Sequence, residues 1–353
     1  RPEGDWLSPF EAADEVARRI EAGDERFTLT TIDASMGLQI AELSYTIDER
    51  TTVEAMGKTV PAIRWVVTNS IVPGVETIEY VDREGESVRT AMAGLELVIL
   101  ESEKEFALSP FSGPDLMQST LISPSRPIDQ PRWSVRGEFV VSVPGGEIPD
   151  LVTGGAQRVE RESPSALRVM IDVENPVPAT PEEIADARYL EASNYCDSED
   201  PEIMATLVRA TRGVKGESPL VRARAMEKFV HTYVDSKSLG VGFATASEVC
   251  QTRQGDCSEH AVLLCALLRA DGIPSRAVSG LVYVDQFVGE RNVFGYHMWS
   301  QALLEIDGVP QWIDLDAAVH PFDATHIAVV TSSLADDDMI NSMVGVAETM
   351  GEL

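Results

Sequence analysis

The stretch from Arg253 to Ala270 reads RQGDCSEHAVLLCALLRA, and it predicts a buried helix that begins at a cysteine. Asp256 and Glu259 have the spacing of a capping box, in which two side chains satisfy backbone N–H groups at the helix start. Residues 261–268 are apolar on all sides, which is typical of a helix inside a domain. Cys257 therefore lies where unpaired N–H groups and the positive end of the helix dipole favour a thiolate.

A cysteine near an apolar helix is more often an inert core residue than a nucleophile, so Cys257 needs partners. His297 lies at the start of a strand-like run, and Asp316 ends a second run that follows the turn at Asp307–Gly308. These three residues have the chemistry of a triad: the thiol attacks, the imidazole moves the proton and the carboxylate orients the imidazole. Asp314 is a rival for the carboxylate, because alternate residues of a strand share a face.

Four ordered blocks between about residues 240 and 320 resemble the transglutaminase-like superfamily, of the bacterial type, which has a papain-like cysteine-peptidase core. The blocks are Gly255-Asp256-Cys257, Leu268 with Gly272-Ile273-Pro274-Ser275-Arg276, His297-x-Trp299, and Trp312-x-x-x-Asp316. The resemblance implies that Cys257 is the nucleophile, His297 the base and Asp316 the third member, since the Trp-to-Asp spacing fits Asp316. The family usually has Asp-Pro-Thr at the last block, where this chain has Asp316-Ala317-Ala318, and this departure affects the turn after the carboxylate.

We predict an α+β protein with an N-terminal β-rich domain followed by a papain-like, transglutaminase-like core. In the core, a helical lobe with Cys257 at a helix N-terminus packs on an antiparallel sheet that carries His297 and Asp316. Short β-rich runs separated by Gly- and Pro-containing turns indicate the β-domain. The expected divisions are an N-terminal helix at 1–26, a sandwich-like β-domain at 27–175, the catalytic domain at 180–335 and a C-terminal helix at 336–353.

Charge and length restrict the class of partner. The 353 residues suffice for two domains, and 58 acidic residues against 28 basic ones give a formal net charge of −30. Such a charge disfavours binding to nucleic acid or to an anionic membrane surface. No apolar run is long enough to suggest a membrane span. The chain begins at Arg1 rather than Met, so localisation stays open, and a trimmed leader would favour a periplasmic or other extracytoplasmic location. The oligomeric state is also open.

A zinc site is the main structural alternative for the cysteines. Cys250, Cys257, His260 and Cys265 lack the paired C-x2-C spacing of structural zinc. If Cys257 and Cys265 share a helix, they stand about 12 Å apart along its axis and cannot reach one ion. We therefore expect neither a metal nor a cofactor. Cys196 and Cys250 could form a disulfide, which sequence alone does not decide.

The expected activity is thiol acyl transfer at a peptide or glutamine side-chain amide, through a thioester that water or an amine resolves. The expected substrate is a protein or peptide. A cysteine peptidase that cleaves main-chain amides and a non-catalytic scaffold on the same fold are the alternatives. Hydrolysis is favoured over transfer because 285–294 reads as a polar loop open to water, and water exclusion decides the fate of reactive intermediates.

One tryptophan within the blocks and three histidines outside them also have expected roles. Trp299 is expected either to shield His297, because it shares a strand face with it, or to be a plain core aromatic. His231, His320 and His326 lie outside the four blocks, and each is predicted to be structural because none has a spaced partner.

Overall fold

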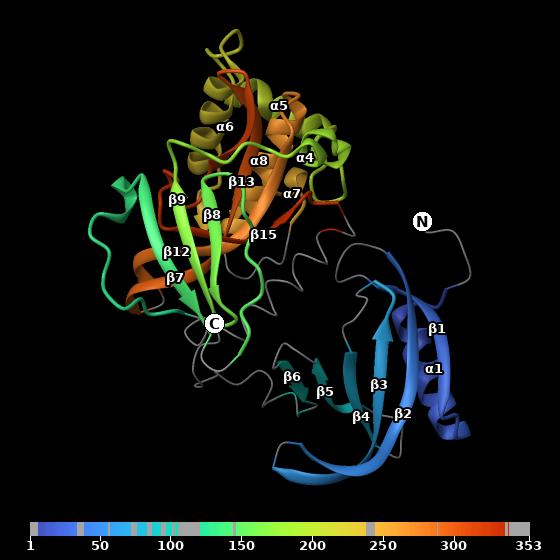
Figure 1. The fold of residues 1–353 in the computed structure, drawn as a ribbon. Helices are drawn as coiled ribbons and strands as arrows, with labels where there is room; N and C mark the ends of the chain where they lie inside the picture. Colours follow the sequence, from blue (N-terminus) through green and yellow to red (C-terminus); the bar gives the residue numbers. More distant parts are fainter. Residues whose placement is uncertain are drawn as a thin grey trace. The chain divides into compact units, whose positions relative to one another are not determined.

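The computed structural model describes residues 6–33, 39–55, 57–71, 76–82, 87–92, 97–100, 102, 104, 121–143, 146–237, 244–287, 289–335 and 338. The chain divides into two compact units, Arg1–Gly113 and Pro114–Leu353 (Figure 1). The predicted C-terminal helix over 336–353 lies, apart from one residue, outside the described residues. None of the helices in the described part of the chain has the length and apolar character that crossing a membrane requires.

In the residues described for the first unit, a helix packs on an antiparallel sheet. Its elements are α1 (Pro9–Ala22), β1 (Arg26–Asp33), β2 (Gln39–Ala55), β3 (Lys58–Asn69), β4 (Glu76–Val81), β5 (Ser87–Met92) and β6 (Leu97–Leu100), and the six strands pair in chain order. Ser8 and Glu11 form a capping box at the start of α1, and Gly23 ends the helix with φ 82°. The apolar face of α1 contacts Phe27, Tyr45 and other residues of the unit's core.

The second unit contains the residues of the four motif blocks. Its helices are η1 (Pro131–Trp133), α4 (Pro181–Ala185), η2 (Ala187–Tyr189), α5 (Pro201–Ala210), α6 (Pro219–Tyr233), α7 (Ala246–Thr252) and α8 (Cys257–Ala270). Its strands are β7 (Arg136–Ser142), β8 (Gln157–Ser163), β9 (Ala166–Asp172), β10 (Ser236–Lys237), β11 (Gln254–Gly255), β12 (Ser275–Phe287), β13 (Glu290–Ile306), β14 (Val309–Leu315) and β15 (His326–Ser332). The four long strands form an antiparallel sheet in the order β14-β13-β12-β15.

Helix α8 is the centre of the larger core of this unit. Every residue from Ser258 to Arg269 is buried, as its all-round apolar sequence predicts. Helices α5, α6 and α7 contribute Ile203, Met226 and Val249 to the same core, and the long sheet contributes Ala302 and Leu315. The predicted α+β class, with a helical lobe on an antiparallel sheet, is confirmed.

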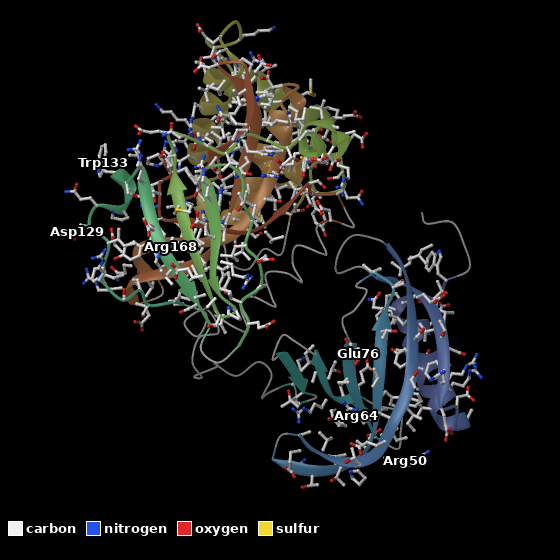
Figure 2. All side chains as sticks on the ribbon, viewed as in Figure 1. Arg50, Arg64, Glu76, Asp129, Trp133 and Arg168 are labelled. Carbon is white, nitrogen blue, oxygen red and sulfur yellow. The ribbon has the colours of Figure 1, made fainter. Side chains whose placement is uncertain are left out.

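A second core joins the small sheet β7-β9-β8 to the long sheet. Leu167, Val169 and Ile171 of β9 pack in one cluster with Val278 and Trp299. The other face of the small sheet is polar, and there Arg168 forms ion pairs with glutamates on β7 and β8 (Figure 2). Because the apolar face of β9 is covered by the long sheet, residues 136–172 belong to the second unit. The division between units therefore lies at Gly113, whereas the sequence-based division was drawn at 175.

Candidate active site

The start of α8 presents Cys257 on a tightly bonded turn. The Asp256 carboxylate accepts from the N–H of Ser258 at 2.9 Å, and the buried Glu259 carboxylate accepts from the N–H of Asp256 at 2.9 Å. The predicted capping box is therefore present. A Cβ at Gly255 would lie 2.3 Å from Cβ of Glu259, so only glycine allows this close turn. Cys257 is the first residue of the helix and is partly exposed.

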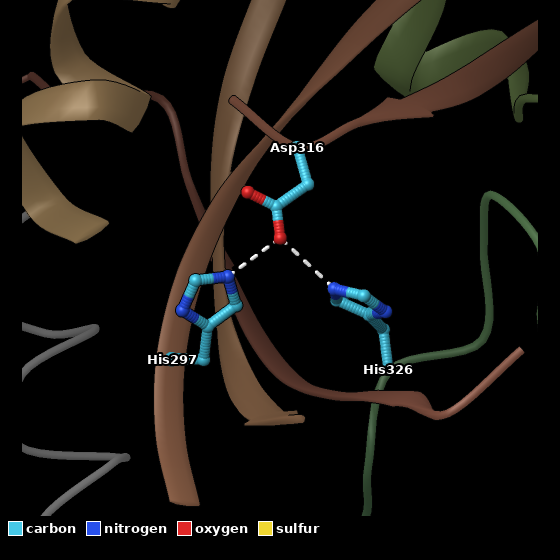
Figure 3. A group of neighbouring side chains, drawn as sticks. All are labelled: His297, Asp316 and His326. Atoms are coloured by element: carbon cyan, nitrogen blue, oxygen red, sulfur yellow. Dashed lines mark hydrogen bonds and ion pairs between the residues drawn. The ribbon is translucent and has the colours of Figure 1, made fainter. Parts of the chain in front are cut away.

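The hairpin of β13 and β14 brings the histidine and the carboxylate together. Ser300 pairs with Leu315 across the hairpin. Asp316 follows Leu315 directly, so it lies beside the segment that carries His297. Nε2 of His297 lies 2.6 Å from Oδ2 of Asp316, and both side chains are buried (Figure 3). The side chain of Cys257 lies close enough to His297 to help raise the pKa of its imidazole. Because Nε2 is occupied by Asp316, the ring nitrogen left for the sulfur is Nδ1.

Both oxygens of the Asp316 carboxylate have hydrogen-bond partners. Oδ1 accepts from the N–H groups of Ala318 at 2.7 Å and Val319 at 2.9 Å. Oδ2 faces Nε2 of His297, and Nε2 of His326 lies 2.9 Å from the same oxygen (Figure 3). These four contacts hold the plane and the position of the carboxylate. The Ala317-Ala318 sequence, which departs from the family pattern, thus still supplies a turn that binds the carboxylate.

His326 is a neighbour of the site that the sequence reasoning missed. It begins β15, which pairs with β12, and it lies across from Val282. The prediction that it is structural rested on its position outside the motif blocks. Strands β14 and β15 lie at opposite edges of the sheet, and the segment between them places His326 against the Asp316 carboxylate. Nothing in the local sequence around Asp323 and His326 indicates this contact.

The charges of the site are strongly coupled. Burial by itself would lower the pKa of His297, but the Asp316 carboxylate and the Cys257 side chain raise it to about 10. Burial disfavours the charged form of Asp316, yet the charge and hydrogen bond of His297, together with His326, hold its pKa well below the usual range. His297 is thus held as an imidazolium beside a carboxylate at neutral pH.

Asp314, the rival carboxylate, is used elsewhere. It accepts from Nε1 of Trp299 at 2.8 Å, from Nε2 of Gln301 at 2.7 Å and from the N–H of Ala156 at 2.9 Å. Burial raises the pKa of this carboxyl group. Trp299 in turn stacks on the imidazole of His297, with 6.1 Å between ring centroids and 20° between the planes. It is both a core aromatic and a cover for the imidazole, so the two expectations for this residue coincide.

The four cysteines are free thiols, and the pairing of Cys196 with Cys250 is not formed. Cys196, Cys250 and Cys265 are buried, and burial raises the pKa of each thiol, for Cys196 to about 12. Nδ1 of His260 lies 2.6 Å from the carbonyl oxygen of Asp256, so this histidine braces the turn before the nucleophile helix.

One group among the described residues has a metal-like arrangement. The ligand atoms of His297, Asp316 and His326 all lie within 4.8 Å of one another. The hydrogen bonds between these atoms account for the short distances without an ion. The zinc set that was weighed from sequence, with Cys250, Cys257, His260 and Cys265, is not among the groups found in the described residues.

His231 and His320 lie beside the same turn. Nδ1 of His231 is 2.9 Å from the carbonyl oxygen of Ala317, and Nδ1 of His320 is 3.6 Å from Oε1 of Glu227. That glutamate oxygen also accepts from the N–H of Asp316 at 2.9 Å. His231 therefore supports the turn directly, and His320 supports it through Glu227.

The polar loop expected at 285–294 is instead the end of a long hairpin. Strands β12 and β13 run to Phe287 and from Glu290, with Gln286 opposite Arg291, and Gly289 at φ 87° lies in the turn. The charged residues that suggested a loop are exposed at the end of the hairpin. These residues are accessible to water in the hairpin as they would be in a loop, so the preference for hydrolysis stays a prediction.

Comparison with known proteins agrees with this description. Residues 206–317 match the profile of the transglutaminase-like superfamily. No curated protein is significantly similar to the chain. Similar solved structures include the periplasmic domain of TgpA from Pseudomonas aeruginosa bound to ethylmercury, at 18% identity over 52% of this chain and 71% of that one, with a TM-score of 0.34. Red sea bream transglutaminase aligns at 10% identity over 83% of this chain and 48% of that one, with a TM-score of 0.28.

These structural scores are low, so the assignment rests on the profile match. The matched segment runs from α5 to the turn after β14 and includes all three residues of the predicted triad. The resemblance inferred from the motif blocks is confirmed, because residues 206–317 match the model of the transglutaminase-like superfamily.

Proposed function

We propose that this protein is a cysteine-dependent acyl-transfer enzyme that acts on peptide or glutamine side-chain amides. Cys257 is the nucleophile, His297 the acid and base, and Asp316 the residue that orients His297. The observation that carries the proposal is the chain of contacts from the Cys257 side chain through His297 to Asp316, at the start of a buried helix. A raised imidazole pKa beside a buried carboxylate favours a thiolate–imidazolium pair.

The reaction proceeds in two halves. The Cys257 thiolate attacks the amide carbonyl carbon, and the negative oxygen that forms is stabilised by the N–H of Cys257, which is free of helix bonding at this position. The C–N bond then breaks, and the nitrogen leaves with the proton of His297, so that a thioester remains. Water or a primary amine attacks the thioester, His297 removes its proton, and the thiolate is released.

The residue arrangement supports this first half-reaction for side-chain and main-chain amides alike. A cysteine peptidase therefore remains the alternative, and the test must separate the products. The protein is incubated with a panel of glutamine-containing peptides, with and without excess primary amine. Mass spectrometry then follows the acyl group on Cys257, ammonia release, amine incorporation and peptide cleavage.

We expect an acyl adduct on Cys257 and either a mass gain of one amine less one ammonia per glutamine or conversion of glutamine to glutamate. Internal cleavage without a change at glutamine would identify a peptidase. Cys257→Ala should abolish every product, whereas the matched control Cys265→Ala removes a buried thiol and should keep them. Absence of any adduct on Cys257 across the panel would refute the proposal and leave a non-catalytic protein on this fold.

A further inference from the structure

We propose that His326 is a positioning residue of the site, and that it acts as a cation that lies between Asp316 and Asp323. It fixes the carboxylate that orients His297 and limits how much of its negative charge acts on His297. This inference rests on the proposed function, because it assigns a role in the same site. It concerns a residue that lies outside the matched segment 206–317.

The shortest contact of each ring nitrogen of His326 is with an oxygen atom. Nε2 lies 2.9 Å from Oδ2 of Asp316, and Nδ1 lies 3.0 Å from the carbonyl oxygen of Asp323 and 3.6 Å from its Oδ1. The one donor near Nδ1, the N–H of Asp323, is more distant at 3.5 Å. A neutral imidazole would leave one ring nitrogen as an acceptor facing oxygen atoms. The doubly protonated ring satisfies both sides.

The groups packed around His326 favour this cation. The titratable neighbours are Asp316 after β14, Asp323 before β15 and His297 on β13, whose ring centroid is 5.7 Å away. The rings of Phe322 and Trp299 contact the imidazole at 4.4 and 5.3 Å between centroids. Burial lowers the pKa of His326, but the two carboxylates outweigh this effect and raise it.

The chain of alternating charges continues beyond Asp323. Arg132, on η1, lies 2.7 Å from Oδ2 of this aspartate, while Oδ1 accepts from the N–H and the hydroxyl of Thr325 at 2.7 and 2.6 Å. Asp323 is thereby held ionised, since His326, Thr325 and Arg132 lower its pKa against the effect of burial. Its negative charge keeps His326 positive, and His326 in turn keeps Asp316 fixed and partly neutralised.

Two imidazolium rings on one carboxylate oxygen have a consequence for His297. Without the positive charge of His326, the full charge of Asp316 would act on His297 and hold its proton more tightly. The pKa of His297 would then rise by on the order of 1 to 2 units, from Coulomb's law at the ring separation with an effective dielectric of ~20. An imidazole that holds its proton too tightly is a poorer acid for the leaving nitrogen.

The first test observes the protonation of His326 in the intact protein. The chain has five histidines, so ¹⁵N-labelled imidazoles can be assigned by single His→Gln variants. We expect both ring nitrogens of His326 to show the imidazolium shift at pH 7, above the usual pKa of ~6.5 for histidine. A neutral ring at pH 7 would overturn the proposal, and this measurement does not depend on any variant folding.

The second test separates charge from hydrogen bonding. His326→Gln keeps an N–H group near Asp316 without the charge, and His326→Phe removes both. The matched control is His231→Gln, a histidine that contacts the same turn through Ala317 and does not bond the carboxylate. Each protein is titrated for His297 by ¹⁵N shifts, and the rate of Cys257 alkylation by iodoacetamide is followed from pH 4 to 9.

In His326→Gln we expect the His297 midpoint to move to higher pH. Alkylation at pH 5 should also slow by roughly three- to tenfold, because a nearby positive charge that favours the thiolate is lost. The rate at pH 9 should match the control. Unchanged midpoints in a folded His326→Gln would show that His326 is only a packing residue. A wild-type thiol that titrates near ~8.5 would refute the proposed function, while the imidazolium signal of His326 would still stand by itself.

Discussion

Replacing Asp316 by Asn, with Asp314→Asn as the matched control, tests which buried carboxylate of the two orients His297. In the wild type, one oxygen of Asp316 binds two backbone N–H groups and the other faces two imidazole nitrogens. An amide has one oxygen and one NH2 group. If the oxygen keeps the two backbone contacts, the NH2 group faces the N–H groups of His297 and His326, and both bonds are lost.

The size of the effect follows from these contacts. Hydrogen bonds to charged groups contribute about 1.5–3 kcal/mol each, so the loss of two destabilises the protein by roughly 3–6 kcal/mol. This agrees with the ~3–5 kcal/mol expected when one partner of a buried ion pair is removed. Turnover should fall on the order of 10³- to 10⁴-fold, because the imidazole loses its orientation and its preferred tautomer.

Asp314→Asn is a milder change at an equally buried position. The amide oxygen can keep the bonds from Trp299 and Gln301, and only the contact with the N–H of Ala156 is lost. The expected cost is about 1–3 kcal/mol, with less than tenfold loss of turnover. Urea unfolding and single-turnover acylation of Cys257 measure both quantities. If Asp314→Asn abolished acylation and Asp316→Asn did not, the assignment of Asp316 would be refuted.

Three other outcomes are expected. Limiting iodoacetamide at neutral pH should label Cys257 before the three other cysteines, which are buried; peptide mapping with a different order would contradict the assignment. The raised pKa of His297 adds stability that is complete below pH ~6.5 and falls by about 1.4 kcal/mol per pH unit as the pH rises towards its folded value of about 10. In urea unfolding between pH 7 and 9, the stability of His297→Gln should fall less steeply than that of the wild type, by this amount per pH unit. Gly280→Ala should destabilise the protein by ~3 kcal/mol or more and lower turnover, because the new Cβ would lie 2.1 Å from the carbonyl oxygen of Ile327 on β15. Thermal unfolding measures this effect. Gly216→Ala is the control, because its Cβ would meet no atom within 4 Å.

The sequence determined the parts of this protein that depend on local patterns. The capping box and the all-round apolar run predicted α8, and the fixed spacing of the motif blocks identified the family. The strand-like runs predicted beside His297 and before Asp316 correspond to β13 and β14. Asp316, predicted from its spacing to Trp312, is indeed the carboxylate that contacts His297. Its catalytic role stays a prediction until the variants are tested.

Tertiary structure decided the features that join distant segments. The apolar face of β9 would suit either a sandwich or a cover for another sheet, and only packing against Val278 and Trp299 assigns it to the second unit. A polar stretch with glycine can be a loop or the end of a hairpin, and cross-strand pairing made 285–294 the latter. His326 carries no local signal. Its contact with Asp316 joins residues that follow β14 and begin β15, two strands at opposite edges of the sheet, so it depends on how the whole sheet is assembled and not on the sequence around His326.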